Sequence, residues 1–185
     1  MFKRAFVLFA EHEVERLSHL EAMKVVLPYL EVVEPVFPSR IHVHFLNRLV
    51  AKSQERTGKA LLPTEIGVIL SHRKIWAKIA KENTDEHFLV LESDSQIVRP
   101  GFLNSETAQK YDLFFWGAWN GYVSLKRSTV KNGVGEPLIK SVYGAYGYSL
   151  NAKAAAYLLK KTARVAYPVD MYKYFVDSTA ISIGS

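Results

Sequence analysis

Two acidic residues, Glu92 and Asp94, directly follow the apolar run 88–91. Alternate residues of an extended segment point to the same side, so both carboxylates can converge on one hard divalent cation. Mg²⁺ and Mn²⁺ are commonly held by one or two protein carboxylates, with water and a substrate diphosphate completing the shell. We therefore take Glu92 and Asp94 as candidate ligands of Mn²⁺ or Mg²⁺. On spacing alone, such a pair is more usually a solvated strand end or a helix N-cap.

A second set of polar residues lies in the segment 64–83, which is the clearest helix in the sequence. Thr64 is the expected N-cap, and apolar residues at helical spacing form a stripe that faces inward. His72 lies one turn before Trp76 on this helix. A packed histidine with both nitrogens bonded is the alternative to a functional one, and Trp76 is more typical of a core than of a binding site.

Strands and helices are expected to alternate around these residues. Segment 6–10 is an expected strand, 14–27 a helix and 29–37 a second strand, which implies a parallel crossover. Segment 88–98 is an expected strand whose acidic end lies where open α/β sheets bind ligands. Further along the chain, the pattern predicts a loop with a short helix at 44–52 inside 39–60, a short helix at 101–111, a strand at 112–119, a hairpin or mobile loop at 120–137, a strand at 141–150 and a helix at 151–163 capped by Asn151.

The length of 185 residues is that of one domain, so we expect a single α/β domain over 1–185 with a mainly parallel mixed sheet flanked by helices. The absence of cysteine excludes disulfides, thiol catalysis and thiolate zinc sites. All six histidines lie at or before His87, so none from the C-terminal half can complete a metal shell. The apolar run 5–10 is too short for a signal peptide or a membrane span, which indicates a cytoplasmic protein.

The net charge of +6 comes entirely from the second half of the chain. Residues 1–94 hold 13 Lys/Arg and 13 Asp/Glu, whereas residues 95–185 hold 11 and 5. Nucleic acid, anionic lipid and phosphate-bearing substrates all favour such a field. No segment matches a common nucleic-acid-binding motif, so we expect no nucleic acid partner. Peripheral contact with an anionic inner membrane, or with a phosphorylated acceptor, stays open.

In five ordered blocks the chain resembles glycosyltransferase family 25, the lipopolysaccharide-type sugar transferases. The matching residues are Arg16, Glu65, Ile66, Gly67, Leu70, Ser71, His72, Trp76, Leu91, Glu92, Asp94, Gly144, Tyr148, Ala155, Leu158, Leu159, Pro168, Val169 and Asp170. The resemblance implies a GT-A-like fold that binds a nucleotide-sugar, with donor-binding roles for Arg16, Glu65, Ser71, His72, Glu92 and Asp94. It also implies inverting transfer of a hexose, most commonly galactose, from a UDP-sugar to a hydroxyl of a lipid-linked oligosaccharide.

Inverting transfer needs a carboxylate that deprotonates the acceptor hydroxyl, and Asp170 is the candidate base. A helix N-cap is the equal alternative for Asp170, and Asp112 is a weaker competitor for the role of base. Aromatic rings stack on the apolar faces of sugars. Most of the aromatic residues between 116 and 148 are expected in the core, whereas Trp119 and Tyr122, beside Gly121, are expected to be exposed and to bind the acceptor.

Several positions depart from the family pattern. Ser93 replaces the first Asp of an Asp-Asp pair, Ala145 and Gly147 stand where Thr and Ala are usual, and His12 stands where an arginine often precedes Arg16. The chain also stops soon after Pro168-Val169-Asp170, where many relatives continue. These departures motivate an alternative function, a degenerate protein that binds a nucleotide-sugar or a partner without turnover.

Overall fold

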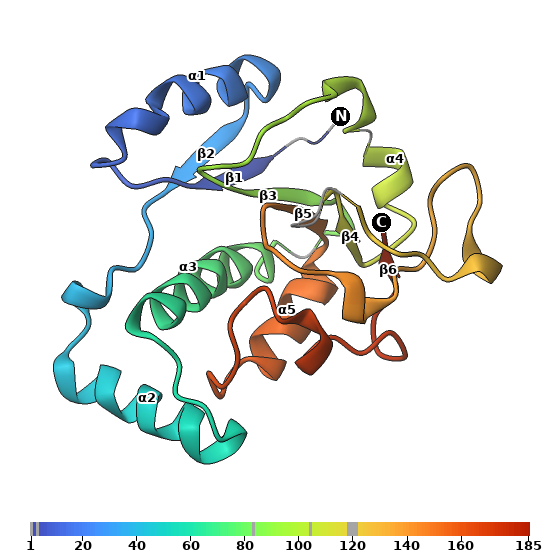
Figure 1. Cartoon of the computed structure of the whole chain (residues 1–185). Helices are drawn as coiled ribbons and strands as arrows, with labels where there is room; N and C mark the ends of the chain where they lie inside the picture. The colour runs from blue at the N-terminus through green and yellow to red at the C-terminus, as the bar shows by residue number, and fades with distance from the viewer. Residues whose placement is uncertain (1, 3, 83, 104, 118–121) are drawn as a thin grey trace.

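The computed structural model describes residues 2, 4–82, 84–103, 105–117 and 122–185 (Figure 1). Its helices are α1 (Leu17–Val26), α2 (Val43–Thr57), α3 (Pro63–Ile79), α4 (Ser105–Ala108) and α5 (Ala152–Lys161). Its strands are β1 (Ala5–Leu8), β2 (Leu30–Val33), β3 (Phe88–Glu92), β4 (Leu113–Phe115), β5 (Gly147–Leu150) and β6 (Ile183–Gly184). The expected α/β class is therefore confirmed.

The six strands form one mixed sheet in the order β2-β1-β3-β5-β4-β6. The pairs β1·β2, β1·β3 and β4·β6 are parallel, and the pairs β3·β5 and β4·β5 are antiparallel. Because β1 and β3 run parallel, with Leu8 opposite Glu92, their carboxyl ends meet at one edge of the sheet. This edge is the place where the acidic end of β3 was expected.

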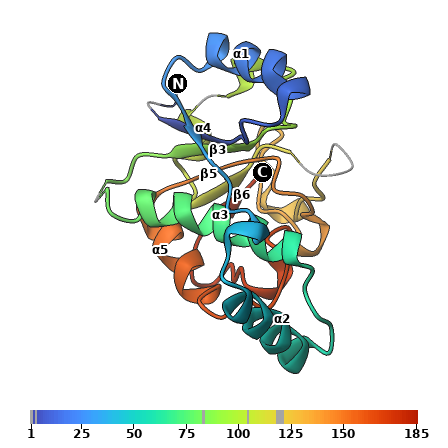
Figure 2. The same cartoon turned by 90° about the vertical axis from the view of Figure 1, so that its left-hand side faces the viewer.

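Helices cover both faces of the sheet (Figures 1 and 2). On one face, alternate residues of the strands pack against α1 and α4 through Val7, Leu20, Met23, Leu89, Ala108 and Phe114. On the other face, the intervening residues pack against α3 and α5 through Phe6, Ile66, Trp76, Val90, Tyr148 and Leu158. The two-residue period of the strands thus divides the core into two layers.

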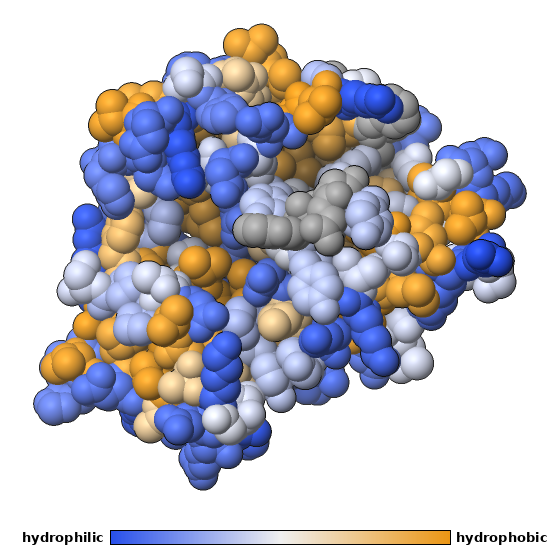
Figure 3. Space-filling model, in the orientation of Figure 1, coloured by the Kyte–Doolittle hydropathy of each residue, from blue (hydrophilic) through white to orange (hydrophobic). Residues whose placement is uncertain are grey.

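Helix α2 is longer than the sequence pattern predicted. The expected loop with a short helix at 44–52 is a continuous helix of 15 residues, and its C-cap is Gly58 in the left-handed region, at φ 75°. Leu46, Leu49 and Val50 pack on the core, while hydrophilic side chains interleave with exposed apolar ones over this region of the surface (Figure 3). The polar composition concealed the helix because only a narrow stripe of it is buried.

Several expected boundaries also change. Helix α3 begins two residues earlier than a Thr64 cap implies, with Leu62 as N-cap and Pro63 in the first turn, where proline is favoured. The expected strands 29–37, 112–119 and 141–150 shorten to β2, β4 and β5. The Asn151 cap is confirmed, because its Oδ1 accepts from the Ala154 amide at 2.9 Å. Antiparallel bridges Leu125–Pro137 and Lys131–Val134 confirm a hairpin within the described part of 120–137.

Candidate active site

The main cleft opens at the carboxyl ends of β1 and β3, which is where open α/β sheets bind their ligands. Its volume is about 320 Å³. The walls come from the segments that follow β1, β2 and β3 and from the first turns of α3. The polar residues that line it are His12, Glu13, Arg16, Thr64, Ser71, Glu92, Ser93 and Asp94. Sequence reasoning had assigned a binding role to four of these, namely Arg16, Ser71, Glu92 and Asp94.

A second cleft, of about 310 Å³, adjoins the main one and contains Glu65, Tyr146 and Asp170. The two clefts share Glu92 and Asp94. The structure therefore brings the candidate base and the candidate metal ligands to neighbouring surfaces. Residues far apart in the chain meet here because the loop after α5 folds back over the end of β3.

Asp94 lies where three clefts meet. A third cleft, of about 570 Å³, runs from Asp94 past Arg99 to Trp116. Partial desolvation and the charge of Glu92 raise the pKa of the Asp94 carboxyl, whereas the charge of Arg16 lowers it. Negative charge is therefore concentrated at this point, and a bound cation would relieve it.

Arg16 is held in place by a small network on the wall of the main cleft. Its Nη1 donates to Glu13 Oε1 at 2.8 Å and to Ser93 Oγ at 2.5 Å, and Ser93 Oγ donates to the same Glu13 oxygen at 3.1 Å. The other oxygen of Glu13 accepts from the Ala10 amide at 3.0 Å. The Ser93 hydroxyl donates to Glu13, whereas an ionised aspartate at this position would repel it. Ser93 thus helps to position the guanidinium.

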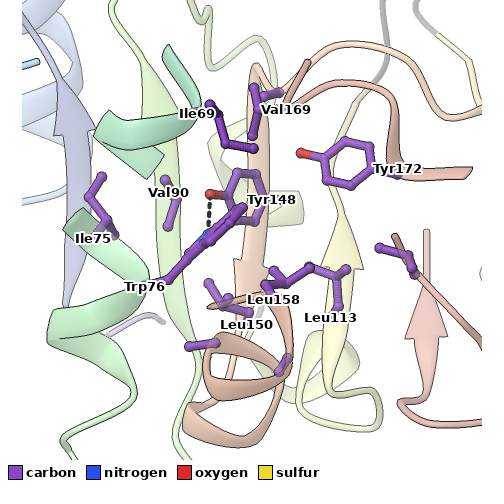
Figure 4. Close-up of a cluster of buried hydrophobic side chains, with 14 of the residues drawn as sticks. Ile69, Ile75, Trp76, Val90, Leu113, Tyr148, Leu150, Leu158, Val169 and Tyr172 are labelled. Carbon is purple, nitrogen blue, oxygen red and sulfur yellow. Dashed lines mark hydrogen bonds between the residues drawn. The ribbon is translucent and has the colours of Figure 1, made fainter. Parts of the chain in front are cut away.

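Glu92 is held from behind by a buried chain of hydrogen bonds. Trp76 Nε1 donates to Tyr148 Oη at 2.8 Å, Tyr148 Oη lies 2.7 Å from His72 Nδ1, and His72 Nε2 lies 3.1 Å from Glu92 Oε1. An ionised Glu92 only accepts, so its bond places a proton on Nε2 and leaves Nδ1 to accept the Tyr148 hydroxyl. Figure 4 shows Trp76 and Tyr148 joined within the core.

His72 is fully buried and does not line any of these three clefts. It contacts Glu92 from the protein interior and can hold that side chain in place. Burial raises the pKa of the Tyr148 hydroxyl well above its ordinary value, so this hydroxyl stays protonated and keeps its role as donor. His72 is thus a packed histidine whose ring nitrogens are both bonded, and one of these bonds reaches the candidate site residue Glu92.

Asp170 is half-buried in the second cleft. Burial, and then the charges of Glu92 and Glu65, raise the pKa of its carboxyl. A raised pKa makes a carboxylate a stronger base at neutral pH. The neighbouring 3₁₀ turn, Tyr172–Tyr174, has Met171 at its N-cap position and no side-chain cap. The N-cap alternative for Asp170 is therefore wrong.

Asp112 lies at the opposite end of the sheet from the clefts. It precedes β4, whose first residue pairs with Leu150 at the far end of β5. Its carboxylate accepts from Lys153 Nζ at 2.8 Å, from Asn151 Nδ2 at 3.0 Å and from the Ser182 amide at 2.9 Å. The weaker competitor for the catalytic base is thus a structural anchor.

The family model of glycosyltransferase family 25 (LPS biosynthesis protein) matches residues 11–173. The chain belongs to this family. The match spans every cleft residue named above, from His12 to Asp170, and family 25 membership makes the chain a glycosyltransferase-family protein of lipopolysaccharide biosynthesis. No individually curated protein matches the chain.

Two of the family 25 residues expected to bind donor have structural bonds. Ser71 Oγ accepts from the Val36 amide at 2.7 Å and donates to the Gly67 carbonyl at 2.7 Å, which fixes α3 to the segment after β2. Glu65 accepts from the Leu62 amide at 2.7 Å and so caps α3. Ser71 lines the main cleft and Glu65 lines the second cleft. The bonds of each residue also stabilise the wall of the cleft that it lines.

Of the two expected acceptor-binding aromatics, only Tyr122 belongs to the described part of the chain. Trp119 lies outside the described residues, and Tyr122 is 64% exposed and lines none of these clefts. Trp116 and Tyr146 line the third cleft instead. Both lie next to strand ends, where the residue pattern does not separate an exposed aromatic ring from a buried one.

Sequence reasoning missed two functional candidates. Glu13 orients Arg16, and its position three residues before Arg16 was the only sign of this ion pair in the sequence. The hydroxyl of Tyr172 is buried and, within the described chain, has no hydrogen-bond partner. Burial, and then the charges of Tyr148, Glu92 and Asp170, raise its pKa well above the ordinary value.

The carboxylates at the clefts fit a divalent cation that a substrate also holds. Within the described part of the chain, no three His, Asp or Glu side chains form a ready-made metal cage. Glu92 and Asp94 share two clefts and interact electrostatically. One or two carboxylates are the usual protein contribution to Mg²⁺ bound with substrate phosphates.

Proposed function

We propose that the chain transfers a hexose from a UDP-sugar to a hydroxyl of a lipid-linked oligosaccharide, with inversion at the anomeric carbon. Galactose is the first sugar to test. The observation that carries the proposal is the junction at Asp94 of the Arg16 cleft with the Asp170 cleft, in a chain of family 25. The mixed sheet with its cleft beside β1 and β3 supports a GT-A-like nucleotide-sugar fold.

The donor would lie in the main cleft. Arg16, held by Glu13 and Ser93, faces this cleft and can pair with a diphosphate oxygen. Asp94 and the free oxygen of Glu92 would hold Mn²⁺ or Mg²⁺, which supplies Lewis-acid stabilisation of the departing nucleoside diphosphate. His72 keeps Glu92 from turning away. Positive charge is thus directed at the place where negative charge develops.

The acceptor would enter the second cleft. Asp170 there can take the proton of the attacking hydroxyl, and Glu65 and Tyr146 line the same surface. Tyr146 also lines the third cleft with Trp116, which supports a longer sugar chain along that side. A general base of this kind typically contributes about 10² to 10⁴-fold in rate.

Substitution of Asp94 tests the donor site. Asp94→Asn should abolish Mn²⁺-dependent UDP binding, because the neutral amide loses the charge that holds the ion against its hydration shell. Titration of UDP, GDP and CMP sugars with and without Mn²⁺ measures both the nucleotide preference and the metal dependence. Lys110→Gln, a substitution at an exposed residue outside the clefts, is the control. Undiminished metal-dependent affinity in Asp94→Asn would remove the metal assignment.

The same nucleotide-sugars distinguish the transferase from a degenerate binder when the release of UDP is measured as well as binding. Metal-dependent hydrolysis or transfer of a UDP-hexose supports the enzyme. Tight UDP-sugar binding with no release of UDP, in the presence of Mn²⁺ and acceptor, supports the binder.

The described residues contain no helix long and apolar enough to cross a membrane. We propose that the enzyme is cytoplasmic and makes peripheral contact with the inner membrane.

A further inference from the structure

A fourth cleft is strongly basic. It has a volume of about 270 Å³ and lies between α2, α3 and the segment after α5. Its charged residues are all cationic, namely Arg48, Lys52, Arg56, Arg73 and Arg164, and no acidic residue lines it. Leu49, Leu70 and Val165 provide apolar surface beside them. Four of the five cations lie within residues 1–94, where Lys/Arg and Asp/Glu are equal in number.

Helical periodicity explains how these cations are gathered. Arg48, Lys52 and Arg56 are four residues apart on α2, so they project from one face. Like charges at this spacing destabilise a helix. The face also carries Phe45, and the guanidinium of Arg48 lies 5.3 Å from the centre of its ring. A helix that concentrates positive charge over a cleft in this way is stabilised by an anion bound there.

Arg73 is the one cation whose position the fold itself explains. Its Nη1 donates to the Leu159 carbonyl at 2.8 Å and to Thr162 Oγ1 at 2.6 Å, which satisfies the last turn of α5. Burial lowers the pKa of its guanidinium, which stays charged because its ordinary pKa is so high. It forms a fixed positive wall of the cleft.

The other four cations have no such explanation. Across the described residues, no ion pair includes Arg48, Lys52, Arg56 or Arg164. They share one cleft instead of dispersing over the surface. No acidic side chain among the lining residues offsets their mutual repulsion, and a bound anion would reduce it.

This cleft is separate from the three clefts around Asp94. It has no lining residue in common with them. On α3, Arg73 follows Thr64 by nine residues, which places it about half a turn round the helix from the residue that faces the donor cleft. A ligand here would approach the opposite side of α3.

We propose that the basic cleft binds a phosphate group, carried either by a soluble phosphorylated molecule or by a phospholipid headgroup. Guanidinium groups pair with phosphate oxygens in a bidentate manner, and the cleft offers four of them with one ammonium. Its volume lies just below the usual range for sites of drug-sized ligands, which suits a headgroup-sized anion. The inference is independent of the transfer reaction.

A paired variant tests the site without disturbing the core. Arg48→Gln with Lys52→Gln removes two charges from exposed positions of α2, and glutamine keeps the helix propensity. The control is Lys131→Gln with Lys140→Gln, which removes the same charge from exposed positions outside the cleft. Circular dichroism and thermal unfolding establish that both variants fold.

Two probes separate the two sources of phosphate. Calorimetric titration with inorganic phosphate, at saturating UDP to fill the donor cleft, measures a soluble ligand, and co-sedimentation with phosphatidylglycerol vesicles measures a headgroup. We expect the α2 variant to bind at least one probe about tenfold or more weakly than both the parent and the control. UDP affinity should be unchanged in it.

Equal binding of both probes by the α2 variant and the control would overturn the proposal, because net charge alone would then account for the affinity. Absence of phosphate and vesicle binding in the parent protein would overturn it as well. Absence of UDP binding in the parent would instead contradict the proposed transferase. The test of the basic cleft would still stand, because it compares the α2 variant with its control.

Discussion

Asp170 differs from Asp112 in surroundings, and the difference shows why a carboxylate's environment decides its role. Burial, and then two nearby carboxylates, raise the pKa of Asp170, whereas the hydrogen bonds of Lys153, Asn151 and Ser182 outweigh burial and lower the pKa of Asp112. The sequence offered both as candidate bases. It ranked Asp112 below Asp170 but did not show that the two lie at opposite ends of the sheet, because strand direction decides which end each residue reaches.

The two aspartates give a matched pair of substitutions. Asp170→Asn should reduce kcat by about 10² to 10⁴-fold with UDP-sugar affinity nearly intact, because the residue faces the acceptor. Asp112→Asn should keep kcat and lose about 1 to 3 kcal/mol of unfolding free energy, because its charge-assisted bonds are weakened. Steady-state kinetics and urea unfolding measure the two effects. Wild-type turnover in Asp170→Asn would assign the base to another carboxylate.

Tyr148 acts on the donor site through His72 and Glu92, although it is buried. Tyr148→Phe should weaken Mn²⁺-dependent UDP binding, because His72 loses the partner that fixes its ring. Tyr157→Phe is the control, since the Tyr157 hydroxyl also makes two bonds, to the Phe175 carbonyl at 3.1 Å and from the Asp177 amide at 3.0 Å, away from the clefts. Both variants should lose about 1 to 3 kcal/mol of stability. UDP affinity that falls equally in the two would show a general effect of destabilisation.

At the scale of elements, α3 and the segment after β2 form one wall of the donor cleft. The helix approaches this segment closely at Gly67, where a Cβ atom would lie 2.6 Å from the Val36 carbonyl oxygen and 3.2 Å from Pro38 Cδ. The backbone cannot yield as a flexible side chain would. Glycine is needed here for close approach, since its backbone conformation is ordinary for a helix.

Gly67→Ala should therefore displace the segment after β2 and lower the unfolding free energy by about 1 to 3 kcal/mol. It should also weaken UDP binding, because Val36 and Pro38 line the main cleft. Gly101→Ala is the matched control, since a Cβ at that position meets nothing within 4 Å. Chemical unfolding and UDP titration of both variants check the expectation, which fails if the two substitutions prove equally mild.

The elements that the sequence predicted well are those with a long buried stripe or a local cap. Helix α5 begins at the expected Asn151 cap, and β1 and β3 follow from continuous apolar runs. The two-residue strand β6 carries no pattern of its own, and it forms because its register with β4 brings Ile183 beside Leu113. Such pairing depends on tertiary structure, which local periodicity does not encode.

At the scale of the whole molecule, the buried His87 makes folding stability depend on pH. Its Nε2 donates to the Tyr111 carbonyl at 2.7 Å, and its Nδ1 lies 3.3 Å from Ser149 Oγ. Burial lowers the pKa of the folded imidazole below 6.5, although the Tyr111 bond and the charge of Asp112 oppose this. Below that pH the unfolded state binds the proton more readily, so the folded state loses stability.

The protein should therefore become less stable as the pH falls from about 6.5 towards 5. His87→Gln should be less stable than the parent at pH 7, but its stability should change less over this interval because glutamine does not titrate. Urea unfolding at several pH values gives both slopes. Parallel slopes in the parent and the variant would exclude His87 as the source. The lowered pKa of Asp112 adds a further loss only below about pH 4.

The meeting of three clefts at Asp94 has a consequence for the order in which substrates bind. A cation and diphosphate seated against this carboxylate from one cleft change the electrostatic potential in the other two, where Asp170 and Arg99 lie. By thermodynamic reciprocity, whatever the donor does to acceptor affinity, the acceptor does to donor affinity by the same factor. If the proposed function holds, a single side chain would couple the two substrates, and random addition with independent affinities is not expected.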